Sequence, residues 1–152
     1  MFTPKKILVP TDFSAPAAIA LEYAKDIARM HGSEIFVIHS VEPAVYPGDI
    51  REMQTDLVTN REYMFELSDS QLKKIIEPLL AAGMKANLRT VYGGNPADEI
   101  VSFSEANDID LICIATHGRS GWQHLMLGSI AERVLRKAKC PVLTVKRKGD
   151  EK

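Results

Sequence analysis

A stretch in the last third of the chain combines the residue types and the spacing of an anion-binding loop. Residues 111–116 form a largely apolar run, residues 117–121 read His-Gly-Arg-Ser-Gly, and Gly128 and Ser129 precede a run with helical apolar spacing. The first run is typical of a strand covered on both faces, and the glycines after it let a ligand approach closely. Because a helix start exposes N–H groups and the positive end of a dipole, the stretch predicts a phosphate site.

Backbone and side-chain donors would supply the chemistry of this site. N–H groups of residues 117–121 and 128–130 would hold phosphate oxygens, and the Ser129 hydroxyl would add a donor or bind a divalent ion. Arg119 would pair with a phosphate or remain solvated. Charged hydrogen bonds of this kind contribute about 1.5–3 kcal/mol each. The alternative is turn chemistry followed by a helix cap, since the chain contains neither Gly-x-x-x-x-Gly-Lys-Ser/Thr nor Gly-x-Gly-x-x-Gly.

Apolar runs alternate with helical patterns along the chain. Strands are predicted at residues 6–10, 34–40, 86–92, 111–116 and 140–146. Helix starts are predicted at Ser14, after residue 49, at Asn95 and at Gly128 or Ser129. In the long second helix Pro78 would cause a kink or a shorter last turn, and the apolar positions are Met64, Leu67, Ile75, Ile76 and Leu79. This order predicts an α/β fold with a doubly wound, five-stranded parallel sheet and helices on both faces.

The predicted sheet brings two candidate segments to one edge. Ligands of such folds bind at the carboxyl ends of the strands where the strand order reverses, and the first and fourth strands should flank that point. Asp12 follows the first strand and Gly118 follows the fourth. Asp12 would accept a hydrogen bond from a base or ribose or help hold a metal ion, or it would cap the loop or helix start. His39 is interpreted as a structural histidine, because no paired nucleophile lies near it in sequence.

The sequence resembles the universal stress protein family in its nucleotide-binding signature. That signature is Gly-x-x-Gly, nine residues, and then Gly followed by Ser or Thr. Gly118, Gly128 and Ser129 match it, whereas Ala115 stands where the first Gly is usual. The resemblance extends over nearly the whole chain and includes Pro-Thr-Asp-Phe at residues 10–13, where family members place the Asp at the nucleotide.

This resemblance implies one universal stress protein domain over residues 1–152, with an adenine-nucleotide α-hydrolase-like fold. It implies a cytoplasmic, homodimeric stress-response protein that binds ATP, with Mg or Mn as an optional companion, and acts as a sensor or regulator. Ser40 replaces an apolar family residue that touches adenine, so the base preference is open. The residues expected at the nucleotide are Pro10, Thr11, Asp12, Ser40, Ala115, His117, Gly118, Arg119, Gly121, Gly128, Ser129 and Ile130.

Other functional classes fit the sequence less well. A phosphoacceptor receiver domain needs an acidic pair after the first strand, where Asp12 stands alone. A flavodoxin-like electron carrier needs a glycine-containing phosphate loop, which residues 11–14 lack. We assign no catalytic residue, because no Ser/His/Asp set, metal-ligand cluster or His-x-Gly-His element occurs. Slow ATP hydrolysis or autophosphorylation stays open, as does a member that has lost the nucleotide and acts through protein partners, which Ala115 and Ser40 would favour.

Composition and charge limit the binding partners and the cellular location that we expect for the protein. A net charge of −1 gives no electrostatic basis for binding nucleic acid or an anionic membrane, and no apolar run approaches the length of a membrane span. The N-terminus lacks the pattern of a signal peptide, so we expect a cytoplasmic protein. Cys113 is expected to be an inert core residue, without a disulfide to Cys140. The last strand would be an uncovered edge, which a second copy would cover in a homodimer.

Overall fold

A computed structural model describes residues 1–42, 53–117 and 127–146, of which residues 53–59 are described by their backbone alone. The strands are β1 (Lys6–Pro10), β2 (Glu34–Val41), β3 (Ala86–Tyr92), β4 (Leu111–Ala115) and β5 (Val142–Val145). The helices are α1 (Ala15–His31), α2 (Met53–Ala81), α3 (Pro96–Ala106) and α4 (Ser129–Lys137). The strands form one parallel sheet in the order β3-β2-β1-β4-β5. The predicted α/β fold is therefore confirmed.

The strand order reverses between β1 and β4, as the sequence predicted. From β1 the chain moves outward through β2 to β3, and then crosses back to β4 and β5. The carboxyl ends of β1 and β4 consequently lie side by side at the edge where such folds bind ligands. The last strand is shorter than predicted: it covers Val142–Val145, because Pro141 has no N–H to contribute to a ladder.

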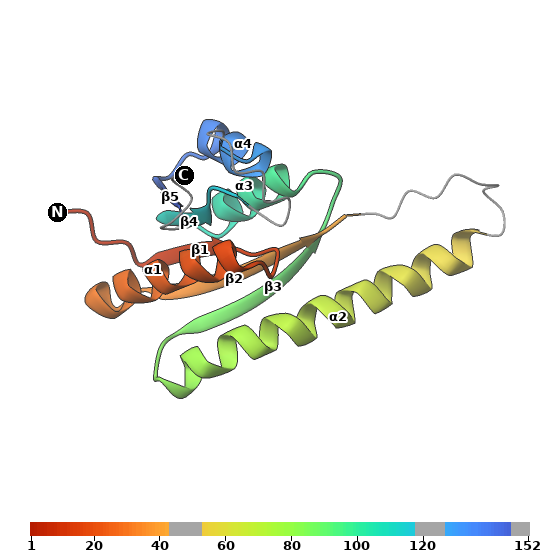
Figure 1. Cartoon of the computed structure of the whole chain (residues 1–152), viewed down its shortest axis with the longest axis horizontal. Helices are drawn as coiled ribbons and strands as arrows, with labels where there is room; N and C mark the ends of the chain where they lie inside the picture. Colours follow the sequence, from red (N-terminus) through yellow and green to blue (C-terminus); the bar gives the residue numbers. More distant parts are fainter. Residues whose placement is uncertain (43–52, 118–126, 147–152) are drawn as a thin grey trace, which may run out of the picture.

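Two apolar layers cover the two faces of the sheet (Figure 1). Alternate strand residues such as Val9 and Val37 pack against α1 and α2. Their neighbours Leu8 and Ile38 pack against α3 and α4 on the other face. This alternation follows from the two-residue period of a strand. Cys113 is fully buried in the first layer, as expected, and burial raises the pKa of its thiol to about 12.

Helix α2 differs from the sequence prediction in two ways. It continues past Pro78 to Ala81, so of the two effects expected of Pro78 the shorter last turn does not occur. Met64 and Leu67 are not core residues, because 38% and 41% of their surfaces are exposed. Figure 1 shows the N-terminal part of α2 extending beyond the sheet. Leu72, which was not predicted, is the fully buried anchor of the helix.

None of the helices that the structure describes is both long enough and apolar enough to span a membrane.

Candidate functional site

The turn between β1 and α1 is held by a backbone hydrogen bond to β2 and by side-chain hydrogen bonds within the turn. The Thr11 amide donates to the Ile38 carbonyl at 2.8 Å, which ties the end of β1 to β2. The Phe13 amide donates to Thr11 Oγ1 and the Ser14 amide donates to Asp12 Oδ1, both at 3.0 Å. Asp12 therefore has the loop-capping contact that the sequence left open as its structural alternative. These bonds fix Thr11 and Asp12 at the carboxyl edge of the sheet.

Phe13 and His39 pack against each other beside this turn, on the sheet face that carries α1 and α2. Phe13 has a backbone φ of 64°, a left-handed conformation that is rare for an aromatic residue. Its ring lies 4.4 Å from the His39 ring, measured between centroids. His39 Nδ1 lies 2.8 Å from the Thr11 carbonyl oxygen, which can only accept, so Nδ1 donates. The interpretation of His39 as a structural, hydrogen-bonded histidine is confirmed.

At Gly128, the start of α4 makes a close backbone contact with the residue that follows β4. Its amide donates to the Thr116 carbonyl at 2.7 Å, and the Thr116 amide donates to the Val145 carbonyl at 2.9 Å. A Cβ atom at Gly128 would lie 2.8 Å from the Thr116 oxygen. The backbone angles of Gly128 (φ −58°, ψ 145°) suit any residue, so the close contact is what requires glycine. Its N–H is already used, which leaves Ser129 and Ile130 as the donors for an anion.

The start of α4 differs from the described starts of α1 and α3. Ser14 caps α1 by accepting from the Ala17 amide, and Asn95 caps α3 by accepting from the amides of residues 97 and 98. At α4 the cap residue is Gly128, without a side-chain hydrogen bond. The first amides of a helix have no acceptor within it. Among the described residues, the N–H groups of the exposed Ser129 and Ile130 have no acceptor, and they lie at the positive end of the helix dipole.

Two buried polar atoms near this edge have no hydrogen-bond partner in the part of the chain that the structure describes. They are Ser40 Oγ, on the next-to-last residue of β2, and His117 Nε2, just after β4. The other ring nitrogen of His117 lies 3.0 Å from Thr116 Oγ1. By alternation, Ser40 shares the sheet face of Ile38, the side of α3 and α4. Unpaired buried polar atoms are rare in native proteins and call for an explanation.

The sheet brings most of the predicted site residues to one edge. Pro10 ends β1 and is followed by Thr11 and Asp12. Ser40 is the next-to-last residue of β2, Ala115 ends β4, and His117 lies two residues beyond it. Gly128, Ser129 and Ile130 begin α4 beside the Thr116 carbonyl. Gly118, Arg119 and Gly121 lie outside the described residues. Among the described residues, no three His, Cys, Asp or Glu side chains are close enough to hold a metal ion.

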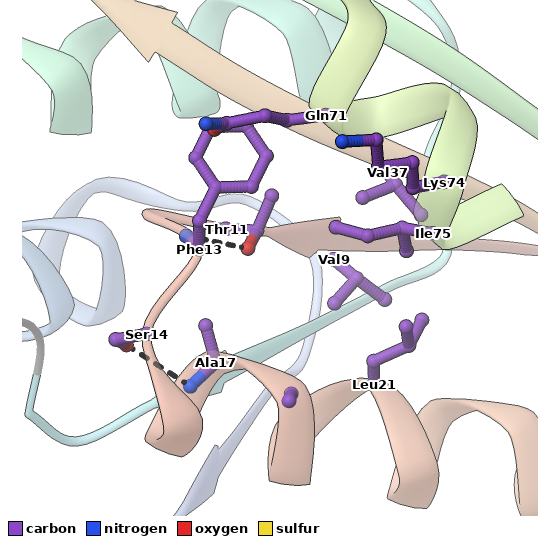
Figure 2. A pocket seen from close by; sticks show the side chains of 11 residues that line it. Val9, Thr11, Phe13, Ser14, Ala17, Leu21, Val37, Gln71, Lys74 and Ile75 are labelled. Carbon is purple, nitrogen blue, oxygen red and sulfur yellow. Dashed lines mark hydrogen bonds between the residues drawn. The ribbon is translucent and has the colours of Figure 1, made fainter. Parts of the chain in front are cut away.

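A cavity of about 250 Å³, which the sequence analysis did not predict, lies on the sheet face that carries α1 and α2, opposite to the face of Ser40. It lies between α1 and α2, over β1 and β2 (Figure 2). Thr11 is the one predicted site residue, among those described, that lines it. No sequence motif marks this cavity, since its walls come from three segments far apart in the chain.

Comparisons with known proteins agree on one family. The model of the universal stress protein family matches residues 3–146. Universal stress protein MJ0531 of Methanocaldococcus jannaschii is 36% identical over 147 residues, which cover 97% of this chain and 85% of that protein. A solved structure of MJ0577 from the same organism superposes with a TM-score of 0.82 at 31% identity, covering 97% of this chain and 99% of the other.

A third similar protein was solved with a ligand. It is a universal stress protein from Archaeoglobus fulgidus in complex with dAMP. It matches with a TM-score of 0.63 at 24% identity, and the match covers 95% of this chain and 100% of that one. At this identity the likeness supports the fold.

Proposed function

Because the chain belongs to the universal stress protein family, we propose that it binds an adenine nucleotide at the carboxyl edge of β1, β2 and β4. ATP is the proposed ligand, with or without a divalent ion held by its phosphates. The protein would act in the cytoplasm as a nucleotide-dependent regulator of a stress response, rather than as a fast enzyme. The dAMP complex of the Archaeoglobus fulgidus protein supports the choice of an adenine nucleotide.

The observation that carries this proposal is the pair of unpartnered polar atoms at the edge, Ser40 Oγ and His117 Nε2. Leaving such an atom buried costs about 1–3 kcal/mol, and a ligand that pairs with it removes that cost. In the proposed site Ser40 would meet the base or ribose. His117 and the amides of Ser129 and Ile130 would meet the phosphates, where the uncapped start of α4 favours negative charge.

The remaining proposed contacts come from both sides of the edge. Pro10, Thr11 and Asp12 would border the base and ribose, and Ala115 would lie beneath the ligand at the end of β4. Gly128 would serve by closing the turn that leads to α4, because its own amide is engaged. Gly118, Arg119 and Gly121 would complete the phosphate loop. We also propose that β5 forms the interface of a homodimer.

Calorimetric titration with ATP, ATP plus Mg²⁺, and AMP tests the nucleotide proposal. The protein must first be shown to be folded and free of nucleotide carried through purification. We expect ATP to bind and AMP to bind at least about tenfold more weakly, because AMP lacks the phosphates that reach α4. If folded, nucleotide-free protein binds neither, the proposal fails and a function through protein partners gains support.

Two serine variants sharpen the test. Ser40→Ala removes a hydroxyl that has no partner among the described residues, so stability should not fall, whereas ATP affinity should drop by about three- to tenfold. Ser104→Ala is the matched control. The Ser104 hydroxyl is buried and donates to the Val101 carbonyl at 2.7 Å, remote from the proposed site. This control should lower stability and leave ATP affinity unchanged. The opposite pattern would remove Ser40 from the site.

A further inference from the structure

The cavity between α1 and α2 has the walls of a ligand site. Val9 and Val37 form its floor, Ala17 and Leu21 line it from α1, and Ile75 lines it from α2 (Figure 2). An apolar cavity of about 150 Å³ is large enough to bind benzene. The volume here, about 250 Å³, accommodates a larger apolar group.

The mouth of the cavity has the opposite character. Lys74 and Gln71 of α2 line it, and Figure 2 shows their polar ends on the same side as the Phe13 ring. Within the described residues, no ion pair or hydrogen bond holds the Lys74 ammonium or the Gln71 amide. None of the lining residues is acidic, and the first turn of α1, which also borders the mouth, carries no acidic residue. The Lys74 ammonium therefore favours an anion at the mouth.

We propose that this cavity binds a small amphipathic carboxylate. Its hydrocarbon tail would lie between α1 and α2, against Val9, Val37 and Ile75. Its carboxylate would pair with Lys74 and accept a hydrogen bond from the Gln71 amide. An apolar pocket with a few convergent polar groups is the usual form of a small-molecule site, and here the polar groups are donors. Medium-chain fatty acids are the ligand class that fits both the walls and the mouth.

The cavity is separate from the proposed nucleotide site. Val9 and Val37 belong to the face of α1 and α2, whereas Ser40 shares the opposite face with Ile38. Thr11 touches both regions, but its side-chain oxygen already accepts from the Phe13 amide. The apolar walls of the cavity and the Ser40 side of the nucleotide site therefore lie on opposite faces of the sheet, and this inference does not depend on the nucleotide proposal.

Titration of the full chain with octanoate, octan-1-ol and octylamine, all below their micelle concentrations, tests the inference. The three probes share a tail and differ in the charge of the head. We expect octanoate to bind at least about fivefold more tightly than octanol, and octylamine to bind most weakly. Absence of octanoate binding, or equal affinity for all three probes, overturns the proposal.

Two lysine variants locate the head group. Lys74→Met keeps an apolar stem and removes the charge, so it should weaken octanoate by about fivefold and change octanol by less than about twofold. Lys73→Met is the matched control, because Lys73 is exposed on the same helix and does not line the cavity. It should change neither affinity. Equal effects of the two variants would contradict a head group at Lys74.

Variants that fill the cavity, and competition with ATP, test where the hydrocarbon tail of octanoate binds. Ala17→Leu should abolish octanoate binding while the protein stays folded, and Ala18→Leu, at the same wall, replaces it if Ala17→Leu fails to fold. Octanoate binding that survives in a folded filled variant overturns the proposal. Saturating ATP should change octanoate affinity by less than about twofold. Displacement by ATP would make the cavity part of the nucleotide site and would also overturn it.

Discussion

At the scale of single residues, the carboxyl edge of the sheet combines very close backbone contacts with buried polar atoms that have no partner in the described part of the chain. Gly128 shows the first feature, because a side chain there would meet the Thr116 carbonyl. Ser40 and His117 show the second. The close contact explains why residue 128 is glycine. The proposal of a ligand rests instead on the buried Ser40 and His117 atoms, which have no partner among the described residues.

Replacing Gly128 by alanine should destabilise the protein by about 1–3 kcal/mol, because the new Cβ would force the Thr116 carbonyl away from the start of α4. Urea denaturation measures the change. Gly94→Ala is the control, since a Cβ there meets nothing within 4 Å and the backbone φ is not positive. That variant should be as stable as the wild type or slightly more stable. Equal losses in both variants would refute the contact argument.

Only part of this residue-level picture could be predicted from the sequence. Gly128 and Ser129 were identified by their position before a helix, but the engagement of the Gly128 amide by Thr116 depends on how β4 and α4 meet in space. Ser40 was noted as a departure from a pattern. That its hydroxyl is buried without a partner follows from neighbours on other strands, which one-dimensional spacing does not contain.

At the scale of elements, the last turn of α2 contains Pro78, which costs the helix one backbone hydrogen bond. Pro78 lacks the N–H that would bond to the Lys74 carbonyl, yet the helix continues to Ala81. Pro78 is exposed, so its replacement loses little packing. Pro78→Ala should raise the free energy of unfolding by about 1–3 kcal/mol.

Thermal and urea unfolding of Pro78→Ala check this expectation. Pro96→Ala is the matched control, because Pro96 is the first residue of α3, where a helix tolerates proline without losing a bond. Little change is expected there. A destabilised Pro78→Ala protein would mean that the proline makes a favourable contribution through the unfolded state or through packing.

The start of α3 is joined to α4 by charged groups. Asp98 accepts from Lys137 Nζ at 2.8 Å and from Arg133 Nη2 at 2.6 Å. The hydrogen bonds from Lys137 and then Arg133 lower the pKa of Asp98 below its usual 3.8. A lowered folded pKa stabilises the fold above the unfolded pKa, and this contribution disappears as the pH falls through the folded value. Because the pair is exposed, the effect should be small and should weaken in salt.

Comparing wild type with Asp98→Asn from pH 7 down to pH 3 measures this contribution. The wild type should be the more stable protein at pH 7, and the difference should shrink as the pH falls below about 4. Raising the ionic strength at pH 7 should also reduce it. A difference that does not change with pH would show that Asp98 acts at the start of α3 by a route other than its charge.

At the scale of the whole molecule, the sheet topology follows from local rules. Alternation of apolar runs with helical patterns indicates right-handed crossovers, and these predict a parallel sheet whose order reverses next to the first strand. The cavity could not be predicted in the same way. Val9, Ala17 and Ile75 line it from β1, α1 and α2, and the space between these three elements depends on how the whole lengths of both helices pack on the sheet.

The outer edge of β5 is the basis for the expected dimer. Within the described residues, β5 pairs only with β4. The carbonyls of Pro141 and Val145 accept from β4, so the alternate residues Val142 and Thr144 direct their backbone groups outward. Such an edge offers unpaired donors and acceptors to another strand, and a second copy related by two-fold symmetry would satisfy them.

Thr144→Pro tests this edge without disturbing the β4–β5 ladder, because it removes an N–H that points outward. Light scattering of the wild type should give twice the chain mass of 16.9 kDa, and the variant should give a mass near 16.9 kDa with an unchanged circular dichroism spectrum. Thr90→Pro would be unsuitable as a control, since Thr90 Oγ1 bonds to Asp69 across to α2. Ser102→Ala, exposed on α3, serves instead and should remain dimeric. A monomeric wild type, or a dimeric Thr144→Pro protein, would exclude an interface built on β5.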